Sequence, residues 1–325
     1  MNLFNKTRIG YVVIESLQLE KWKSFFVDGL GLHLAQESDD IVAFRMDSHD
    51  RRVIVKRGTS EDVVAIGVHA DDEQTLQEIL KRVRVKNINI GRGEEKEAHE
   101  RGVEQFYRFF GPKKTKVEVY CKPIISNQPL KMLSSGFVTG DGGMGHFAIT
   151  SKRANEMLAF WQDIFDARVS DYIEEHMSGV TLDITFTRLN ERHHSIAIAK
   201  TRGLSVDPIR TSIQHGNMVA KSMDDMVSAF RRLKNLGFKM AHEIGQHPND
   251  KELSFYAITP SGFEWELGFN ALTVNEETWQ SVQYQGISLW GHKPPKHSLL
   301  NTVSVNAGNL VGVIRSLFRT EYTPY

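Results

Sequence analysis

The sequence has almost no cysteine, since Cys121 is the only one among 325 residues. A single thiol excludes an intramolecular disulfide and a cysteine-ligated zinc or iron–sulfur site, and it is typical of a reducing compartment. No apolar run approaches the roughly 20 residues that a membrane-spanning helix needs. The first residues also lack the charged start and apolar stretch of a secretory signal. We therefore expect a cytoplasmic protein with no membrane partner.

An excess of charge is also absent, because 40 Lys and Arg balance 40 Asp and Glu. Without a basic surface field, nucleic acid is not concentrated around the protein, and we predict no nucleic-acid partner. The remaining composition, 40% hydrophobic and 25% charged, is ordinary for a globular protein and indicates no functional class. At about 150 residues per domain the length favours two domains, and function must come from local motifs.

Four segments of the chain repeat one order of predicted elements: a strand, a helix, and then two or three strands. The repeats begin near Ile9, Val63, Met144 and Ser212. In the third repeat, apolar side chains between residues 157 and 165 recur at the spacing of one helical face. Each repeat therefore predicts a βαβββ module.

The segment 121–145 contains proline and several glycines without a periodic element, so it divides the four modules into two pairs. We predict an α+β fold of two domains, residues 1–130 and 131–274, followed by a C-terminal extension over residues 275–325. In each domain the two modules would form a curled mixed sheet around a cavity. Equivalent strands of the two modules then converge, so residues distant in sequence can share one site.

Two histidines occupy corresponding positions in this repeat, His146 in the third module and His215 in the fourth. Glu266 lies in the last predicted strand, where alternation places it on one face with Glu264. Taken singly, each has a simpler explanation as a partly buried histidine or a solvated glutamate. Together, two imidazoles and a carboxylate form the facial arrangement that holds non-haem Fe(II) and leaves positions open for substrate and oxygen. Mn(II) suits the same ligands.

The run 245–266 has the form G-x-H-x7-F-Y-x2-T-P-x-G-x3-E. This run resembles the signature of the type I extradiol ring-cleavage dioxygenases of the vicinal oxygen chelate superfamily. The resemblance extends to Gly145-His146-Phe147, to residues 190–197 and to residues 289–292, and so covers essentially the whole chain. It implies an oxidoreductase that uses Fe(II) and inserts both atoms of O2 into an aromatic diol. Ring opening beside the two hydroxyls would give a yellow 2-hydroxymuconic-type product, and a homo-oligomer is expected.

The resemblance also implies a role for each residue of the site. The metal ligands would be His146, His215 and Glu266; the catalytic residues would be His194, His247 and Tyr256; the substrate-binding residues would be Asn249 and Asp250. Among the catalytic residues, His194 would be the acid–base group and Tyr256 would hydrogen-bond a substrate oxygen. His193 remains an alternative to His194, because neighbouring side chains on a strand point to opposite faces.

The first two modules carry Tyr11 and Gly67 where the later modules carry His146 and His215. Neither residue supplies an imidazole, so we predict no metal site in the first domain. Glu118 follows Pro112 by the same six residues that separate Glu266 from Pro260. Without histidine partners, we expect Glu118 to be a solvated strand residue.

Other functions on the same scaffold stay open at this point. A hydroquinone-cleaving dioxygenase, a glyoxalase-like isomerase or another metal-chelate enzyme would use similar ligands, and a non-catalytic protein of this fold would bind a small aromatic compound. The set of His194, His247 and Tyr256 favours catechol cleavage, because isomerisation needs no such trio. Large apolar residues such as Ile173, Phe186, Met177 and Phe255 would line a pocket for a 3-substituted or bicyclic catechol, or would simply fill the core.

Overall fold

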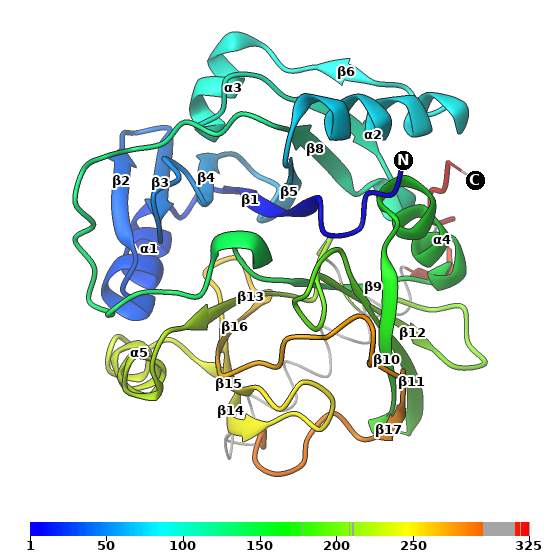
Figure 1. The fold of residues 1–325 in the computed structure, drawn as a ribbon. Helices are drawn as coiled ribbons and strands as arrows, with labels where there is room; N and C mark the ends of the chain where they lie inside the picture. The colour runs from blue at the N-terminus through cyan, green and yellow to red at the C-terminus, as the bar shows by residue number, and fades with distance from the viewer. Residues whose placement is uncertain (178, 208, 210, 295–315, 319, 325) are drawn as a thin grey trace.

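The computed structural model describes residues 1–177, 179–207, 209, 211–294, 316–318 and 320–324, and it contains two curled mixed sheets with helices on their outer sides (Figure 1). The N-terminal sheet, blue to cyan in Figure 1, lies above the C-terminal sheet, green to orange. This arrangement confirms the predicted fold class. Among the described residues, no helix is both long and apolar enough to cross a membrane.

The first sheet has eight strands in the order β2-β3-β4-β1-β5-β8-β7-β6. Its strands are β1 (Thr7–Ser16), β2 (His33–Glu37), β3 (Ile41–Arg45), β4 (Val53–Arg57), β5 (Asp62–Ala70), β6 (Gly91–Arg92), β7 (Tyr107–Phe110) and β8 (Lys116–Tyr120). Its helical segments are α1 (Leu19–Lys23), the π-helix η1 (Ser24–Leu30), α2 (Glu73–Val85), α3 (Glu95–Arg101) and the 3-10 turn η2 (Pro112–Lys114).

The second sheet has nine strands in the order β14-β15-β16-β13-β9-β12-β11-β10-β17. Its strands are β9 (Phe147–Thr150), β10 (Arg168–Met177), β11 (Val180–Arg188), β12 (Ile196–Thr201), β13 (His215–Ala220), β14 (Met240–Gln246), β15 (Leu253–Ile258), β16 (Glu264–Phe269) and β17 (Gln283–Gln285). Helices α4 (Ala154–Phe165) and α5 (Met223–Asn235) belong to this half, and the short turn η3 (Gly140–Gly142) precedes it.

The same pairing rule builds all four modules. The last strand of each module runs parallel to its first, as in β1–β4, β5–β8, β9–β12 and β13–β16. The first strands of two paired modules are antiparallel neighbours, β1 with β5 and β9 with β13. Two elements were not expected: helix α3 inside the second module, and β17, which extends the second sheet by pairing in parallel with β10. We propose the division at residue 130, in the segment between β8 and β9, as the domain boundary.

Capping side chains start helices α2 and α5, and a glycine follows the end of α5. The Asp72 side chain accepts the backbone N–H of Thr75 at the start of α2, and Ser222 does the same for Asp225 at the start of α5. Helix α5 ends at Asn235 with Leu236 as its C-cap, and the next residue, Gly237, has a φ of +83°, a left-handed conformation that glycine adopts without strain.

The two halves are joined through their helices and share one hydrophobic core. Arg232 of α5 donates to the backbone oxygen of Gly29 in η1 over 2.9 Å. The Phe26 ring packs at right angles against Trp265 of β16, with ring centres 5.0 Å apart. This core lies between the two sheets. The apolar residues inside each curled sheet form clusters of their own, separate from this core.

The inner faces of the two sheets differ in what fills them. The inner side of the first sheet is filled by buried apolar side chains from its strands, from helix α3 and from the segment after α3, namely Tyr11, Val13, Ile41, Ala43, Ile54, Ala65, Ala98, Val103, Phe106 and Tyr120. In the second sheet the corresponding apolar cluster is small and comprises Ala148, Ile173, Phe186 and Ala197. The rest of that inner face carries histidines and carboxylates, so the candidate site lies in the second sheet.

Candidate active site

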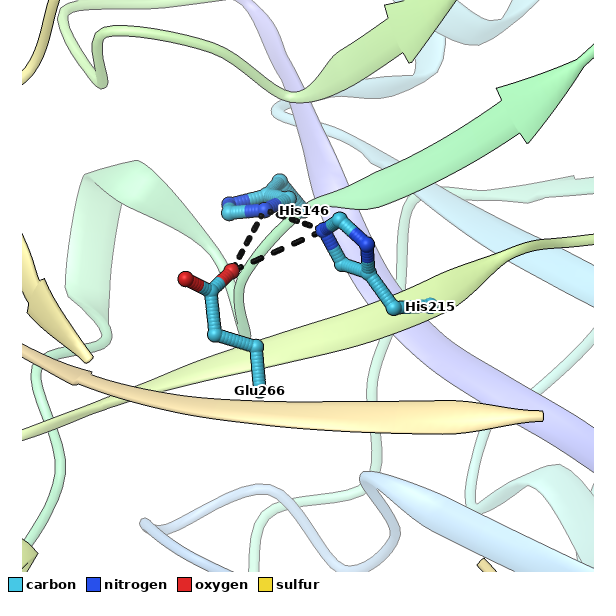
Figure 2. A group of neighbouring side chains, drawn as sticks. All are labelled: His146, His215 and Glu266. Atoms are coloured by element: carbon cyan, nitrogen blue, oxygen red, sulfur yellow. Dashed lines mark hydrogen bonds and ion pairs between the residues drawn. The ribbon is translucent and has the colours of Figure 1, made fainter. Parts of the chain in front are cut away.

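Three side chains from neighbouring strands converge inside the second sheet (Figure 2). His146 directly precedes β9, His215 opens β13, and Glu266 lies in β16. The Nε2 atom of His146 is 3.2 Å from Nε2 of His215 and 3.2 Å from Oε2 of Glu266, and Nε2 of His215 is 3.6 Å from the same oxygen. The strand order β16-β13-β9 brings these residues together although up to 120 residues separate them in sequence.

This geometry fits a divalent cation. Bonds of about 2.1 Å at right angles around a metal separate neighbouring donor atoms by about 3 Å. The ring of His215 is oriented by its other nitrogen, because Nδ1–H donates to Oε1 of Gln214 and directs Nε2 toward the centre. The Gln214 amide donates in turn to Glu264 over 2.8 Å. On the other side, Asn217 Nδ2 donates to Oε2 of Glu266 over 3.0 Å.

The protonation states also suit a cation site. Burial lowers the pKa of His146, and burial lowers the pKa of His215 to about 3, so both imidazoles are neutral near pH 7. Burial opposes ionisation of Glu266, but hydrogen bonds with His146 and His247 outweigh it and hold the pKa of this carboxyl well below its usual range. Neutral imidazoles and an ionised carboxylate are the forms that bind metal.

A second pair, His247 and Tyr256, lies beside Glu266. The Tyr256 hydroxyl is 2.8 Å from Nε2 of His247, and the same nitrogen is 3.1 Å from Oε1 of Glu266. The other ring nitrogen of His247 donates to the backbone oxygen of Ile287 over 2.6 Å. Burial opposes a charge on His247, but the hydrogen bond and the charge of Glu266 outweigh it and raise its pKa to about 9. Burial, followed by the charge of Glu266, raises the pKa of Tyr256 well above its usual value, so this hydroxyl stays protonated.

His193 and His194 lie in the turn between β11 and β12 and not on a strand. The expectation that they face opposite sides of a sheet is therefore wrong, and both rings are buried in one region. The ring of His194 lies 3.9 Å from that of His146 and meets Phe186 edge-on at 4.9 Å. Burial, and then the proximity of His146, lowers the pKa of His194 well below its usual value, so this imidazole is neutral.

Asn249 and Asp250 lie in the loop between β14 and β15, and both are buried. Asp250 Oδ2 is 3.7 Å from Nδ1 of His194, and Oδ1 accepts the backbone N–H of Glu252 over 3.0 Å. The Asn249 amide nitrogen has no hydrogen-bond partner within the part of the chain that the structure describes.

Several residues that the sequence patterns did not indicate also contact this set. Asn217 stands two residues after His215 on the same strand, so alternation alone could have placed it on the same face. The ring of His292 lies 4.3 Å from that of His247, and its Nε2 lies 3.1 Å from the Ser254 hydroxyl. With Ile287, it makes the described part of the C-terminal extension one wall of the site. Local sequence carries no signal for that contact.

The apolar residues suggested for a substrate pocket divide between site and core. Phe186 contacts His194, and Ile173 belongs to the same small apolar cluster. Phe255 is fully buried and packs at 5.2 Å against Phe230 of α5, so it belongs to the core on the opposite face of its strand. The Met177 side chain lies outside the described residues.

The equivalent place in the first sheet holds an ion pair. Glu118 is fully buried, so the expectation of a solvated residue is wrong. Arg101 donates to both carboxylate oxygens of Glu118 over 3.1 Å each, and the Tyr11 hydroxyl donates over 2.7 Å. A Cβ atom at Gly67 would lie 2.6 Å from the Tyr11 ring, so the close approach requires glycine there. The expectation failed because Arg101 comes from α3, a helix that the sequence pattern did not reveal.

Family models match two parts of the chain. Residues 143–267 match the Glyoxalase/Bleomycin resistance protein/Dioxygenase superfamily, and residues 9–58 match Dihydroxybiphenyl dioxygenase BphC D1. The first match contains the three converging side chains of Figure 2.

Whole-chain comparisons agree with these matches. The chain is 32% identical to biphenyl-2,3-diol 1,2-dioxygenase of Metapseudomonas furukawaii over 90% of this chain and 95% of the relative. It is 31% identical to 3-methylcatechol 2,3-dioxygenase of Pseudomonas putida over 88% of this chain and 97% of the relative. A crystal structure of BphC, a halotolerant catechol dioxygenase, superimposes with a TM-score of 0.79 at 27% identity, covering 89% and 95% of the two chains. The chain therefore belongs to the extradiol ring-cleavage dioxygenases of the vicinal oxygen chelate superfamily, and it is an oxidoreductase.

Proposed function

We propose that this enzyme uses Fe(II) to cleave a catechol next to its two hydroxyls, with both atoms of O2 entering a yellow 2-hydroxymuconic-type product. The observation that carries the proposal is the facial set of His146, His215 and Glu266, with donor atoms 3.2 to 3.6 Å apart. Two imidazoles and one carboxylate with open positions are typical of non-haem Fe(II) oxygenases. Mn(II) is the alternative metal for the same ligands.

In this proposal His146, His215 and Glu266 hold the ion. Bound Fe(II) supplies Lewis acidity toward both oxygens of the diol and electron transfer to O2. The protein contributes the remaining steps through proton transfer and positioning, and each has a side chain suited to it.

The neutral imidazole of His194 takes a proton from a diol hydroxyl and later returns one. Its buried ring lies against His146, which supports a position beside the bound diol. A neutral imidazole at the site is the form that a general base requires. Asp250, 3.7 Å from His194, stabilises the positive charge that then develops on the ring.

Tyr256 and His247 hold the anionic oxygen of the substrate. The Tyr256 hydroxyl stays protonated because burial raises its pKa, so it donates a hydrogen bond. His247 supplies a second donor from the adjacent position. Donors fixed in a buried site stabilise a developing negative charge better than water does, because they need no reorganisation. The free amide of Asn249 provides a further contact to the diol.

The substrate we propose is a 3-substituted or bicyclic catechol. Beside His194 lies the apolar cluster of Ala148, Ile173, Phe186 and Ala197, which suits an aromatic ring and an apolar substituent. Named substrates of the relatives, biphenyl-2,3-diol and 3-methylcatechol, carry such substituents. We also propose that the protein is cytoplasmic, in keeping with its single cysteine, and that it forms a homo-oligomer, as the family resemblance implies.

The test is anaerobic reconstitution with Fe(II), followed by aerated 2,3-dihydroxybiphenyl while oxygen uptake and yellow absorbance are recorded. We expect one O2 consumed per molecule of yellow product. The same protein loaded with Mn(II) distinguishes the two metals, and the His146→Ala variant is the control for free iron. No uptake with this diol and a panel of catechols, despite bound iron, would contradict the proposal and favour hydroquinone cleavage or isomerisation.

A further inference from the structure

A chain of three buried side chains leads from the interior of the second sheet to His194. Asp171 of β10 is fully buried, and its Oδ2 is 2.8 Å from Nε2 of His193. Nδ1 of His193 is in turn 3.1 Å from Nδ1 of His194. We propose that Asp171 and His193 are positioning residues that fix the proton of His194 on Nδ1 and leave Nε2 free as the base. The proposal rests on the catalytic role proposed for His194.

The hydrogen-bond directions follow from the chemistry of each group. A carboxylate only accepts, so Nε2–H of His193 donates to Asp171. In its neutral form, with the proton on Nε2, His193 has a lone pair on Nδ1. Two imidazole nitrogens at 3.1 Å need one proton between them, and His194 must supply it from Nδ1. His194 therefore presents a bare Nε2 on the other edge of its ring.

The backbone around Asp171 is shaped to aim its side chain inward. The pairing of β10 with β11 shifts register between Val169 and Asp171, which leaves Ser170 in a β-bulge. A bulge re-aims the neighbouring side chain and is common next to active sites. The second carboxylate oxygen of Asp171 accepts the backbone N–H of Val282 over 2.7 Å, so the carboxylate is held at both oxygens.

The turn that carries His193 is held from two sides. Its backbone oxygen accepts a hydrogen bond from the Ser170 hydroxyl. Trp279 packs edge-on against the His193 ring at 5.5 Å and donates from Nε1 to the backbone oxygen of Ser170 over 2.8 Å. These contacts prevent rotation of the His193 ring, so its two nitrogens keep their partners.

A buried acid that holds a histidine in one tautomer also stabilises the cation formed when that histidine takes a proton. Here the effect passes through His193, since Asp171 lies in direct contact with His193 and not with His194. His193 and Asp171 contact no substrate in this arrangement. They act on the reaction only through the orientation and proton position of His194.

The same atoms allow a different use, because donor atoms of His193, His194 and Asp250 lie within 4.8 Å of one another. A second cation there would take the Nδ1 lone pair of His194 and force its proton onto Nε2. The hydrogen-bond chain and a second cation therefore predict opposite tautomers and different metal contents. Both quantities can be measured.

The first variant is Asp171→Asn. With Val282 still donating to the amide oxygen, the new NH2 group faces His193 and forces Nε2 to accept. The proton of His193 moves to Nδ1, so His194 must carry its proton on Nε2 and loses its basic edge. We expect kcat to fall at least 100-fold, with iron content and KM for the diol within about threefold of wild type. Asp183→Asn, at a half-buried carboxylate of β11 that pairs with Arg202, is the matched control and should keep wild-type kcat.

A second pair of variants separates hydrogen-bond direction from packing. In His193→Gln, the amide NH2 donates to Asp171 and the amide oxygen accepts Nδ1–H of His194. Both hydrogen bonds therefore keep the same donor and acceptor sides as in wild type. In His193→Phe, the ring is retained and both hydrogen bonds are lost. We expect the Gln variant to keep kcat within about tenfold of wild type and the Phe variant to lose it as Asp171→Asn does. Equal loss in both variants would overturn the proposal even if Asp171→Asn failed to fold.

The proton position is read directly by ¹⁵N NMR of histidine-labelled protein loaded with diamagnetic Zn(II). We expect His194 protonated on Nδ1 in wild type and on Nε2 in Asp171→Asn, with one zinc bound per chain. His194 protonated on Nε2 in wild type, or a second zinc that His193→Phe removes, would overturn the proposal. This measurement needs no turnover. It therefore tests the hydrogen bonds from Asp171 through His193 to His194 even if the proposed catechol cleavage is wrong.

Discussion

Arg101 donates to both carboxylate oxygens of Glu118 at the place in the first sheet that Glu266 occupies in the second. Both carboxylates lie on the last strand of a module, and both are buried. In the second sheet Oε2 of Glu266 faces the imidazoles of His146 and His215, the two residues proposed to share a divalent cation with it. In the first sheet a guanidinium from α3 supplies the positive charge. The same strand position of the repeat thus carries a buried glutamate in both halves. The positive charge beside it is a guanidinium in the first half and is proposed to be a metal ion in the second.

Removing Arg101 should destabilise the protein without affecting the metal site. In Arg101→Met, Glu118 is left buried without its cation, and we expect the free energy of unfolding to fall by about 3–5 kcal/mol. Urea unfolding followed by circular dichroism measures the loss. Arg202→Met, at an exposed arginine, is the control and should lose much less. Equal stability of Arg101→Met and wild type would contradict the stabilising role of this ion pair.

Replacing any one of His146, His215 and Glu266 by alanine should abolish metal retention. Each variant leaves two donor atoms at a site that needs three, so we expect less than a tenth of the wild-type iron after gel filtration, and turnover to fall with it. Metal analysis of reconstituted protein checks this. Full activity in any one variant would remove that residue from the ligand set.

His194→Ala should separate catalysis from metal binding. The variant keeps all three proposed ligands, so we expect wild-type iron content and a kcat lower by about 10²–10⁴, the usual contribution of a general acid–base group. Iron analysis and steady-state oxygen uptake are measured on the same sample. His176→Ala, at an exposed histidine, is the control. If His194→Ala loses iron, His194 is a ligand and the assignment must be exchanged.

His69 should make the first sheet sensitive to acid. Burial, and then the charge of Arg8, lowers its pKa to about 4, whereas the unfolded chain titrates near 6.5. Above pH 6.5 both states are neutral and the full stability is present. As the pH falls from 6.5 toward 4, only the unfolded chain binds the proton, so unfolding becomes easier by up to about 3 kcal/mol.

The measurement is the free energy of unfolding of wild type and His69→Gln between pH 4 and 7. The difference between the two curves isolates His69, because other groups titrate in both proteins. We expect the variant to lose less stability on acidification than wild type does. His99→Gln, at an exposed histidine, is the control for the loss of an imidazole as such. Parallel curves for wild type and His69→Gln would show that folding does not lower the pKa of His69.

Local patterns in the sequence determined the modules and the candidate residues. The apolar stripe of α4 and the stop of α5 at Gly237 depend on neighbouring residues alone, so periodicity and glycine geometry predict them. Because a module is repeated, corresponding positions identify His146 and His215 as a pair before any contact is known. The resemblance of the run 245–266 to a family signature adds His247, Tyr256 and Glu266, which lie in the loop before β15, in β15 and in β16.

The tertiary structure alone decided the contacts between segments that are distant in sequence. Arg101 reaches Glu118 from a helix without a strong sequence pattern, and the bulge at Ser170 turns Asp171 toward His193. The turn before β12, which no alternation rule describes, carries both His193 and His194 toward the interior. Such contacts depend on strand register and on the packing of remote elements. A sequence pattern records which residues share a face but not which other segment that face will meet.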